Sequence, residues 1–199
     1  MWKTRWKTRG GDFMAYTPRL TSDGIVDNFH WYSDNPFYQA GYGMPNCTCY
    51  AWGRFWEIGD PNSTGENKPT QLPTGDGGVW WERAVASGYY DTGQTPQLGA
   101  VICFYDNNGG AGHVAIVEEI DTQTGQITCS NSAWQSTFFF LTYITPVNGK
   151  YDWSHYTFQG FIYNPYADQP TPPTPGGDVY RSHFPWVLYA RKLRKKRRF

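Results

Sequence analysis

One short stretch, positions 45–56, constrains the fold of this chain more than any other. It begins as a turn, because Gly41, Gly43 and Pro45 break the chain there, and Asn46 is a residue type that favours the N-cap of a helix. The residues that follow Asn46 predict a helix that places Tyr50, Ala51 and Trp52 in the core and ends at Gly59. Before this helix, residues 20–45 predict irregular structure.

The predicted helix places Cys47 at its first position. Unpaired backbone N–H groups and the positive end of the helix dipole meet there, and both favour an anion. A thiolate would be stabilised at such a place, so the pattern predicts a lowered pKa for Cys47. A cysteine in this position, with a histidine elsewhere, is a candidate nucleophile. The alternative is a small cysteine buried in the core.

The remainder of the domain changes from helix to sheet. A second short helix is predicted at 78–88, with Trp80, Ala84 and Val85 on its buried face, and Gly88 closes it. Five strands joined by short turns then predict an antiparallel meander, so the fold class is α+β. The predicted strands are 99–105, 113–120, 126–131, 138–143 and 156–163.

At 199 residues the chain is long enough for one domain with additional ends. A tandem Trp-Lys-Thr-Arg repeat begins it, and a run rich in proline and glycine follows the last strand. The predicted boundaries are a basic aromatic arm at 1–11, the folded domain at 12–166, a linker at 167–178 and an aromatic, basic tail at 179–199.

Charge is segregated along the chain although the net charge is zero. Twelve of the seventeen basic residues lie in the first ten or the last nineteen positions, while all the acidic residues lie between Asp12 and Asp178. Basic ends serve solubility or hold the acidic body, or they bind an anionic polymer, a membrane surface or nucleic acid. No apolar run reaches the roughly 20 residues of a membrane span, and the N-terminus lacks the apolar region of a signal peptide.

A cysteine nucleophile needs a base that accepts its proton and later protonates the leaving amine. His113 is the best candidate, because it begins a strand of small and β-branched residues and follows Gly110-Ala111-Gly112, which would leave room for substrate. His30 and His155 lie in loops with a surface role as the default, and His183 lies beyond the linker. The alternative for His113 is an ordinary histidine at a strand edge.

The base needs an acceptor that orients its other ring nitrogen. Asn131 ends the strand that would pair antiparallel with the His113 strand, so its side-chain carbonyl can lie close to the imidazole. Glu118 and Glu119 are alternative acceptors, but they lie farther along the strand and are expected to face solvent.

The remaining cysteines predict neither a disulfide framework nor a zinc site. Cys47 and Cys49 point to different sides of the predicted helix, so they should not pair. Cys103 and Cys129 lie in apolar strands and are expected to be buried. No Cys/His spacing suggests structural zinc, and the glycine-rich turns lack the Lys-Ser/Thr of a phosphate loop.

Three blocks of the sequence, taken together and in order, resemble the CHAP domains, the cysteine- and histidine-dependent amidohydrolase/peptidases. The resemblance covers about residues 40–165. Many members have Glu at the position of Asn131 and an Asn two places later, where this chain has Ala133. The blocks are Asn46-Cys47-Thr48-Cys49-Tyr50-Ala51, then Leu98-Gly99-Ala100-Val101 with Gly112-His113-Val114-Ala115-Ile116-Val117-Glu118, and finally Ile127-Thr128-Cys129-Ser130-Asn131-Ser132-Ala133-Trp134.

The resemblance implies a papain-like fold and cleavage of a peptide or amide bond in bacterial peptidoglycan. Cys47 would be the nucleophile, His113 the base and acid, and Asn131 the residue that orients His113, with 12–166 as the catalytic domain. The bond would be that of an N-acetylmuramoyl-L-alanine amidase or an endopeptidase. No cofactor is expected. Asp23, Asp27 and Asp34 do not match the calcium-binding spacing of some relatives, so no calcium requirement is expected.

The expected setting is extracellular, at the bacterial cell wall. The lack of a recognisable signal peptide favours a phage product, carried on the virion or released during lysis. The basic ends would then bind an anionic wall polymer, a membrane surface or virion proteins, with no specific nucleic acid as partner. The alternative function is a structural or wall-binding module on a CHAP-like scaffold that has little or no catalysis.

Overall fold

The computed structural model describes residues 16–25 and 29–167 of the 199-residue chain. The predicted arm at 1–11 and tail at 179–199 lie outside the described residues, as does the predicted linker apart from Ala167. No helix among the described residues is long and apolar enough to cross a membrane.

Both predicted helices are confirmed. Asn46 is the N-cap of the first of them, and Gly88, with a left-handed φ of 60°, ends the other. Trp80 and Ala84 are buried as predicted, but Val85 is 52% exposed, so its predicted burial is wrong. The helical segments of the described residues are α1 (Pro36–Gln39), α2 (Cys47–Gly59), the 3₁₀ turn η1 (Gly77–Val79) and α3 (Trp80–Ser87).

The helix α1 was not predicted, since it lies in the segment at 20–45 that favours irregular structure. It forms because Asn35 caps it through the backbone N–H of Phe37, and Pro36 occupies its first turn, where a missing N–H costs nothing. Phe37 then stacks on Trp80 of α3, with ring centroids 5.9 Å apart. One turn of helix is therefore stabilised by packing rather than by length.

Six strands form one antiparallel sheet in the order β1-β6-β2-β3-β4-β5. The α+β fold class is confirmed, and each of the five predicted strands is present with its ends shifted by at most two residues. The two-residue strand β1 was not predicted. The strands are β1 (Thr92–Gly93), β2 (Val101–Asp106), β3 (His113–Ile120), β4 (Ile127–Asn131), β5 (Phe140–Ile144) and β6 (Tyr156–Ile162).

The predicted meander holds for β2 to β5 but is wrong for β6. Instead of pairing with β5, β6 pairs with β2 on one side and with β1 on the other, so that Ile162 lies opposite Val101. Phe161 and Ile162 are both fully buried, and they belong to the two different cores described next. A strand that is apolar on both faces needs an inner position that is covered on both sides.

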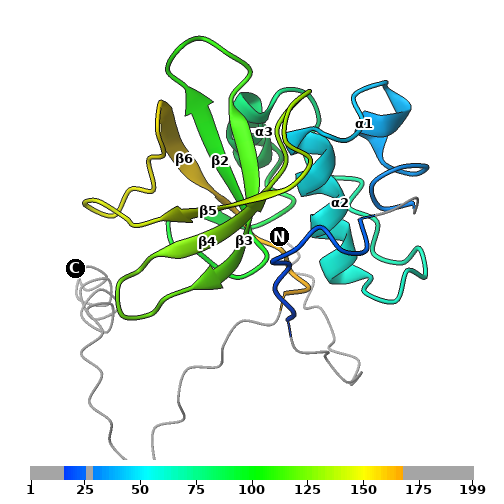
Figure 1. The fold of residues 1–199 in the computed structure, drawn as a ribbon, viewed down its shortest axis with the longest axis horizontal. Coiled ribbons are helices and arrows are strands. Elements are labelled where there is room, and N and C mark those ends of the chain that lie inside the picture. Colours follow the sequence, from blue (N-terminus) through cyan, green and yellow to red (C-terminus); the bar gives the residue numbers. More distant parts are fainter. Residues whose placement is uncertain (1–15, 26–28, 168–199) are drawn as a thin grey trace, which may run out of the picture. The chain divides into compact units, whose positions relative to one another are not determined.

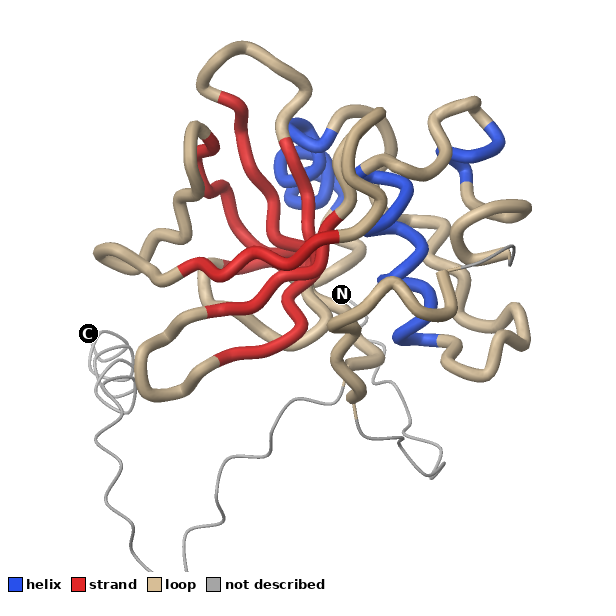
Figure 2. The backbone as a smooth tube through the Cα atoms, viewed as in Figure 1, coloured by secondary structure: helices blue, strands red, loops and turns tan. Residues whose placement is uncertain are grey.

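The sheet separates two apolar clusters, and the α-helices lie together to one side of it (Figures 1 and 2). Along β3, Val114 and Ile116 pack into the cluster with α2 and α3, whereas Ala115 and Val117 pack into the cluster on the other face. This alternation follows from the two-residue period of a strand. It places α2, which begins with Cys47, against the strand that begins with His113.

The small residues ahead of His113 allow close chain packing, and the room that they were expected to leave for substrate stays a prediction. Gly112 has a φ of 74°, and a Cβ there would lie 2.3 Å from the backbone of Gly78. The Ala111 carbonyl accepts a hydrogen bond from the Gly78 N–H at 2.8 Å, and a Cβ on Gly77 would lie 3.0 Å from the His113 backbone. Glycines are required because two backbone segments touch here, and this contact fixes where β3 begins.

Candidate active site

Cys47 occupies the first residue of α2, as the sequence predicts. The side-chain carbonyl of Asn46 accepts the backbone N–H groups of Thr48 at 2.7 Å and Cys49 at 3.0 Å. The Asn46 backbone N–H in turn donates to the Ser132 hydroxyl at 3.0 Å. The start of the helix is therefore held by the loop that follows β4. The cap and this loop together fix the position of the Cys47 thiol.

The predicted lowering of the Cys47 pKa is wrong for the free protein. Burial raises the pKa of this thiol to about 11, and the backbone N–H groups of Val114, Thr48 and Cys47 itself oppose the rise without cancelling it. The physical reason is desolvation: the packing around the sulfur removes water that would solvate a thiolate, and this cost outweighs the N–H groups at the start of the helix. Cys47 rests as a neutral thiol.

The structure brings His113 and Asn131 together. The Nε2 atom of His113 lies 2.9 Å from the Asn131 Oδ1 atom. The Asn131 amide nitrogen donates to the Cys129 carbonyl at 2.9 Å and to the Thr142 hydroxyl at 3.0 Å. Because a backbone carbonyl only accepts, these contacts orient the amide with Oδ1 toward the ring, and Nε2 must carry the proton. Nδ1 is then left with a free lone pair.

Thr142 is a part of this arrangement that sequence reasoning missed. It lies on β5, opposite Cys129 in the strand register, and it is 8% exposed. The signal available in the sequence was its place in the predicted strand at 138–143, which pairs with the strand that ends at Asn131. A threonine at this position gave no indication by itself of a role at the site.

Aromatic rings surround the His113 imidazole. The ring centroids of Trp153 and Tyr156 each lie 5.6 Å from that of His113, and those of Phe104 and Phe140 lie 6.3 and 6.5 Å away. His113 is 5% exposed, and this burial lowers its pKa to about 4, against a smaller opposing contribution from Asn131. The imidazole is therefore neutral at pH 7, as a base must be.

Cys47 and His113 lie at the same end of the domain. The backbone N–H of Val114, the residue after His113, acts on the Cys47 sulfur. Tyr156, whose ring packs on His113, has a pKa raised by burial and by Asp106, and a thiolate at Cys47 would raise it further, which places Tyr156 near the Cys47 sulfur. Three residues separated by up to 84 positions in the sequence are thus gathered where α2, β3 and β4 meet. The arrangement offers a thiol, a neutral base and an orienting amide.

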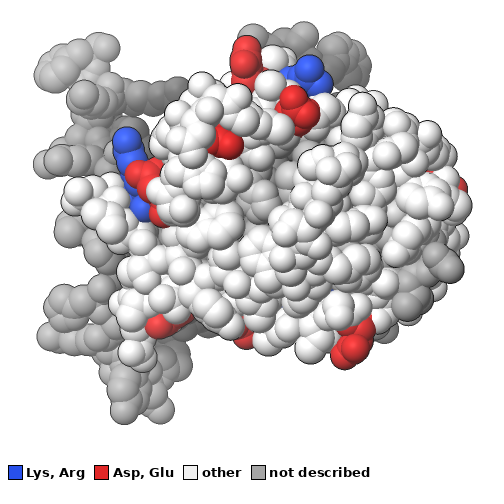
Figure 3. Space-filling view, turned by 45° about the horizontal axis from the view of Figure 1, so that its top comes forward, with Lys and Arg blue, Asp and Glu red and all other residues white. Residues whose placement is uncertain are grey.

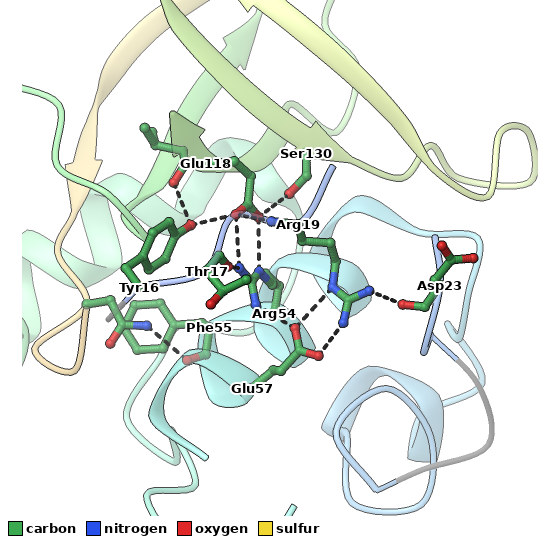
Figure 4. Close-up of polar contacts among 11 residues, drawn as sticks. Tyr16, Thr17, Arg19, Asp23, Arg54, Phe55, Glu57, Glu118 and Ser130 are labelled. Carbon is green, nitrogen blue, oxygen red and sulfur yellow. Dashed lines mark hydrogen bonds and ion pairs between the residues drawn. The ribbon is translucent and has the colours of Figure 1, made fainter. Parts of the chain in front are cut away.

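The expectation that Glu118 faces solvent is wrong, while Glu119 is exposed as predicted. Glu118 is fully buried and accepts hydrogen bonds from the Tyr16 hydroxyl at 2.5 Å and the Ser130 hydroxyl at 2.7 Å (Figure 4). It also accepts two from the Arg54 guanidinium, both at 3.0 Å, and one from the Arg19 backbone N–H at 2.8 Å. With these partners, Glu118 is not the residue that orients His113.

The Glu118 cluster joins the two elements that carry the candidate site. Arg54 lies on α2, seven residues after Cys47, and Glu118 lies on β3, five residues after His113. Arg54 also contacts Glu57 at 2.6 Å, and Glu57 pairs with Arg19 (Figure 4). A buried, fully bonded ion pair between a helix and a strand fixes how one lies on the other.

A surface position was predicted for both His30 and His155, and it is wrong for His30 and confirmed for His155. His30 is buried, not at the surface, and packs against the Trp56 ring at 4.7 Å with the Asp60 carboxylate 3.4 Å from its Nε2 atom. Burial lowers the pKa of His30, although Asp60 opposes this. His155 is exposed, with Asp106 at 3.7 Å. Neither lies among the residues gathered at Cys47.

Because His30 and His113 are buried, we expect the protein to lose stability in acid. The pKa of His113 is about 4 when folded and about 6.5 when unfolded, so the unfolded chain binds a proton first as the pH falls. Stability should therefore decline between about pH 6.5 and pH 4, by roughly 3 kcal/mol for His113 alone, with a further decline in the same direction from His30.

Urea unfolding of the full chain at pH 7, 5.5 and 4.5 measures this decline. His113→Gln should flatten the pH dependence, and His155→Gln, at an exposed position, is the matched control that should leave it unchanged. An equal decline in the wild type and in His113→Gln would show that His113 is not held neutral by burial.

All four cysteines are free thiols. Cys103 and Cys129 are fully buried as predicted, and Cys49 is fully buried as well. Among residues 16–25 and 29–167, no group of three or more His, Cys, Asp or Glu side chains is arranged to hold a metal ion.

The fold and this geometry define an α+β domain in which a cysteine at a helix N-terminus lies beside a strand with a hydrogen-bonded His–Asn pair. Residues 37–133 match the family model of the CHAP domain. This stretch of the chain is therefore similar to the CHAP domain family. The packed unit around it extends beyond the match, since Tyr16 and the strands β5 and β6 belong to it.

The chain is also similar to a crystal structure of an N-acetylmuramoyl-L-alanine amidase from Staphylococcus aureus. The two are 24% identical, with a TM-score of 0.42, and the match covers 71% of this chain. It covers 36% of the amidase chain, so this chain corresponds to about a third of that protein.

Proposed function

We propose that this chain hydrolyses an amide or peptide bond of bacterial peptidoglycan through Cys47, His113 and Asn131. The CHAP match supports the class of substrate, because the family resemblance implies wall hydrolysis. The observation that carries the proposal is the contact of 2.9 Å between His113 Nε2 and Asn131 Oδ1. It leaves His113 Nδ1 as the free base. His113 begins β3, and the backbone N–H of the next residue, Val114, acts on the Cys47 sulfur.

In the proposed reaction, Cys47 Sγ attacks the carbonyl carbon of the scissile bond while its proton moves to His113 Nδ1. The C–N bond then breaks, and the leaving amine takes that proton. The acyl group remains on sulfur as a thioester. A water molecule gives a proton to His113 and attacks the thioester, the C–S bond breaks, and the proton returns to sulfur.

Proton transfer accompanies attack in this proposal instead of preceding it. A thiol pKa of about 11 and an imidazole pKa of about 4 both favour the neutral pair before substrate arrives. The backbone N–H of Cys47 is not among those that the Asn46 side chain accepts, so it is the candidate donor to the oxyanion. The arrangement resembles that of papain-like enzymes in its order of helix cysteine, strand histidine and asparagine.

The test is digestion of purified sacculi, one preparation from a Gram-positive and one from a Gram-negative bacterium. The full chain should release fragments in which one new amine and one new carboxyl group appear for each bond cut, and mass spectrometry identifies the bond. A folded protein that releases nothing from either preparation would overturn the proposal. In that case the chain is a structural or wall-binding module on the same scaffold.

The phage-associated setting stays a prediction of the sequence. So does the binding of a wall polymer, membrane surface or virion protein by the basic ends, because those ends lie outside the described residues. Peptidoglycan is the partner that the proposed chemistry requires.

A further inference from the structure

Two exposed aromatic rings lie beside the candidate site and have no part in the chemistry proposed above. Tyr42 is five residues before Cys47, and Trp134 is three residues after Asn131. Their ring centroids are 5.8 Å apart, with the planes inclined at 48°. Tyr42 is 55% exposed and Trp134 is 45% exposed. We call this pair the aromatic platform.

The platform is held to the start of α2 by backbone contacts. The Gln135 N–H donates to the Pro45 carbonyl at 3.3 Å, and the Ala133 N–H donates to the Thr137 carbonyl at 2.9 Å, which closes the loop that carries Trp134. The Asn46–Ser132 hydrogen bond joins the same two loops. The loops that carry the two rings are therefore held at the start of α2 before any ligand binds, so that binding costs little in ordering.

The two chain segments that carry the platform contain no charged residue. Residues 36–53 and residues 122–149, which contain both loops, include no Asp, Glu, Lys or Arg. Figure 3 turns forward the upper side of Figure 1, where α2 and β3 begin, and its charged side chains lie toward the rim around an uncharged middle. An uncharged aromatic surface selects a neutral ligand with an apolar face.

In peptidoglycan the sugar fits this surface better than the stem peptide does. A pyranose ring presents a face of C–H groups whose positive edge is attracted to the negative face of an aromatic ring. The N-acetylmuramoyl sugar is neutral once its lactyl carboxyl is joined in an amide, whereas the stem peptide carries ionised groups. A sugar bound beside the start of α2 would direct the amide bond that follows it toward Cys47.

We propose that Tyr42 and Trp134 bind the N-acetylmuramoyl ring, so that Cys47 attacks the lactyl carbonyl and the bond cut is the one between N-acetylmuramic acid and L-alanine. This rests on the proposed function and selects the amidase over the endopeptidase. The sugar stays on the acyl side, and so the Cys47 thioester carries it until water arrives, while the stem peptide leaves with a free L-alanine amine.

Binding to the full-length Cys47→Ala protein tests the platform without relying on hydrolysis. The two ligands are muramyl dipeptide and the same dipeptide without the sugar, measured by saturation-transfer NMR and calorimetry. We expect muramyl dipeptide to bind at least about tenfold more tightly. Adding Trp134→Ala or Tyr42→Ala should remove most of this advantage. Tyr143→Ala, at a tyrosine of β5 that is 62% exposed, is the control that should keep it.

Equal affinity for the two ligands, or an advantage that survives Trp134→Ala, would overturn the platform. So would digestion products that carry only new termini between amino acids, and in that outcome the hydrolase of the previous subsection still stands. If the protein binds the sugar but cuts no bond in the wall, the proposed hydrolase activity is wrong and the proposed sugar-binding site still stands.

Discussion

Replacing Cys47 by alanine is expected to lower the rate of peptidoglycan hydrolysis by at least about 10³-fold, since no thioester can form without the sulfur. Fold and stability should change little, because Cys47 is only partly buried and Asn46, not the thiol, caps α2. The measurement is the release of soluble fragments from sacculi, with the thermal midpoint of both proteins recorded alongside.

Cys49→Ala is the matched control for this prediction. Cys49 lies two residues along the same helix, fully buried, with its sulfur 3.5 Å from the Trp31 carbonyl. Its variant should lose some stability yet keep most of the hydrolytic rate. If Cys47→Ala released fragments at the rate of the wild type, another group would be the nucleophile and the mechanism would fall.

The same cysteine gives a second measurement through its reactivity. With a thiol pKa of about 11, iodoacetamide should label Cys47 slowly at pH 7, and the rate should continue to rise up to pH 10. A rate that levels off below pH 8 would show instead that Cys47 and His113 already form an ion pair in the free protein. The three buried cysteines should stay unlabelled while the protein is folded.

Glu118→Leu is expected to destabilise the protein by about 3–5 kcal/mol, the cost of breaking a buried ion pair by removing one of its members. Arg54 would lose its two hydrogen bonds to the carboxylate, while Tyr16 and Ser130 would lose an acceptor. Urea unfolding at pH 7 measures the change, read from the midpoint at a constant slope.

Glu119→Gln is the control, because the neighbouring carboxylate is exposed and should contribute less than about 0.5 kcal/mol. A double variant, Arg54→Met with Glu118→Leu, separates two explanations. It should recover part of the lost stability if the cost comes from the buried charge of Arg54, which keeps only Glu57 as a carboxylate partner. No recovery would assign the cost to Tyr16, Arg19 and Ser130, and a loss from Glu118→Leu no larger than that of Glu119→Gln would contradict the role of the cluster.

Local patterns in the sequence were sufficient for the helices and strands that carry the candidate site. Asn46 as a cap, Gly59 and Gly88 as ends, and the alternation along 113–120 depend on residues within one turn or one strand. The closeness of His113 and Asn131 was also predictable, because adjacent antiparallel strands joined by a short turn bring known positions together.

Contacts between segments that are distant in sequence decided the rest. The burial of Glu118 depends on Tyr16, Arg19 and Arg54, which lie at least 64 positions away, and β6 takes its place beside β2 because both of its faces need cover. The pKa of Cys47 turned out opposite to the prediction for the same reason. Helix geometry alone favours a thiolate, but desolvation depends on everything packed around the sulfur, and only the folded chain sets that.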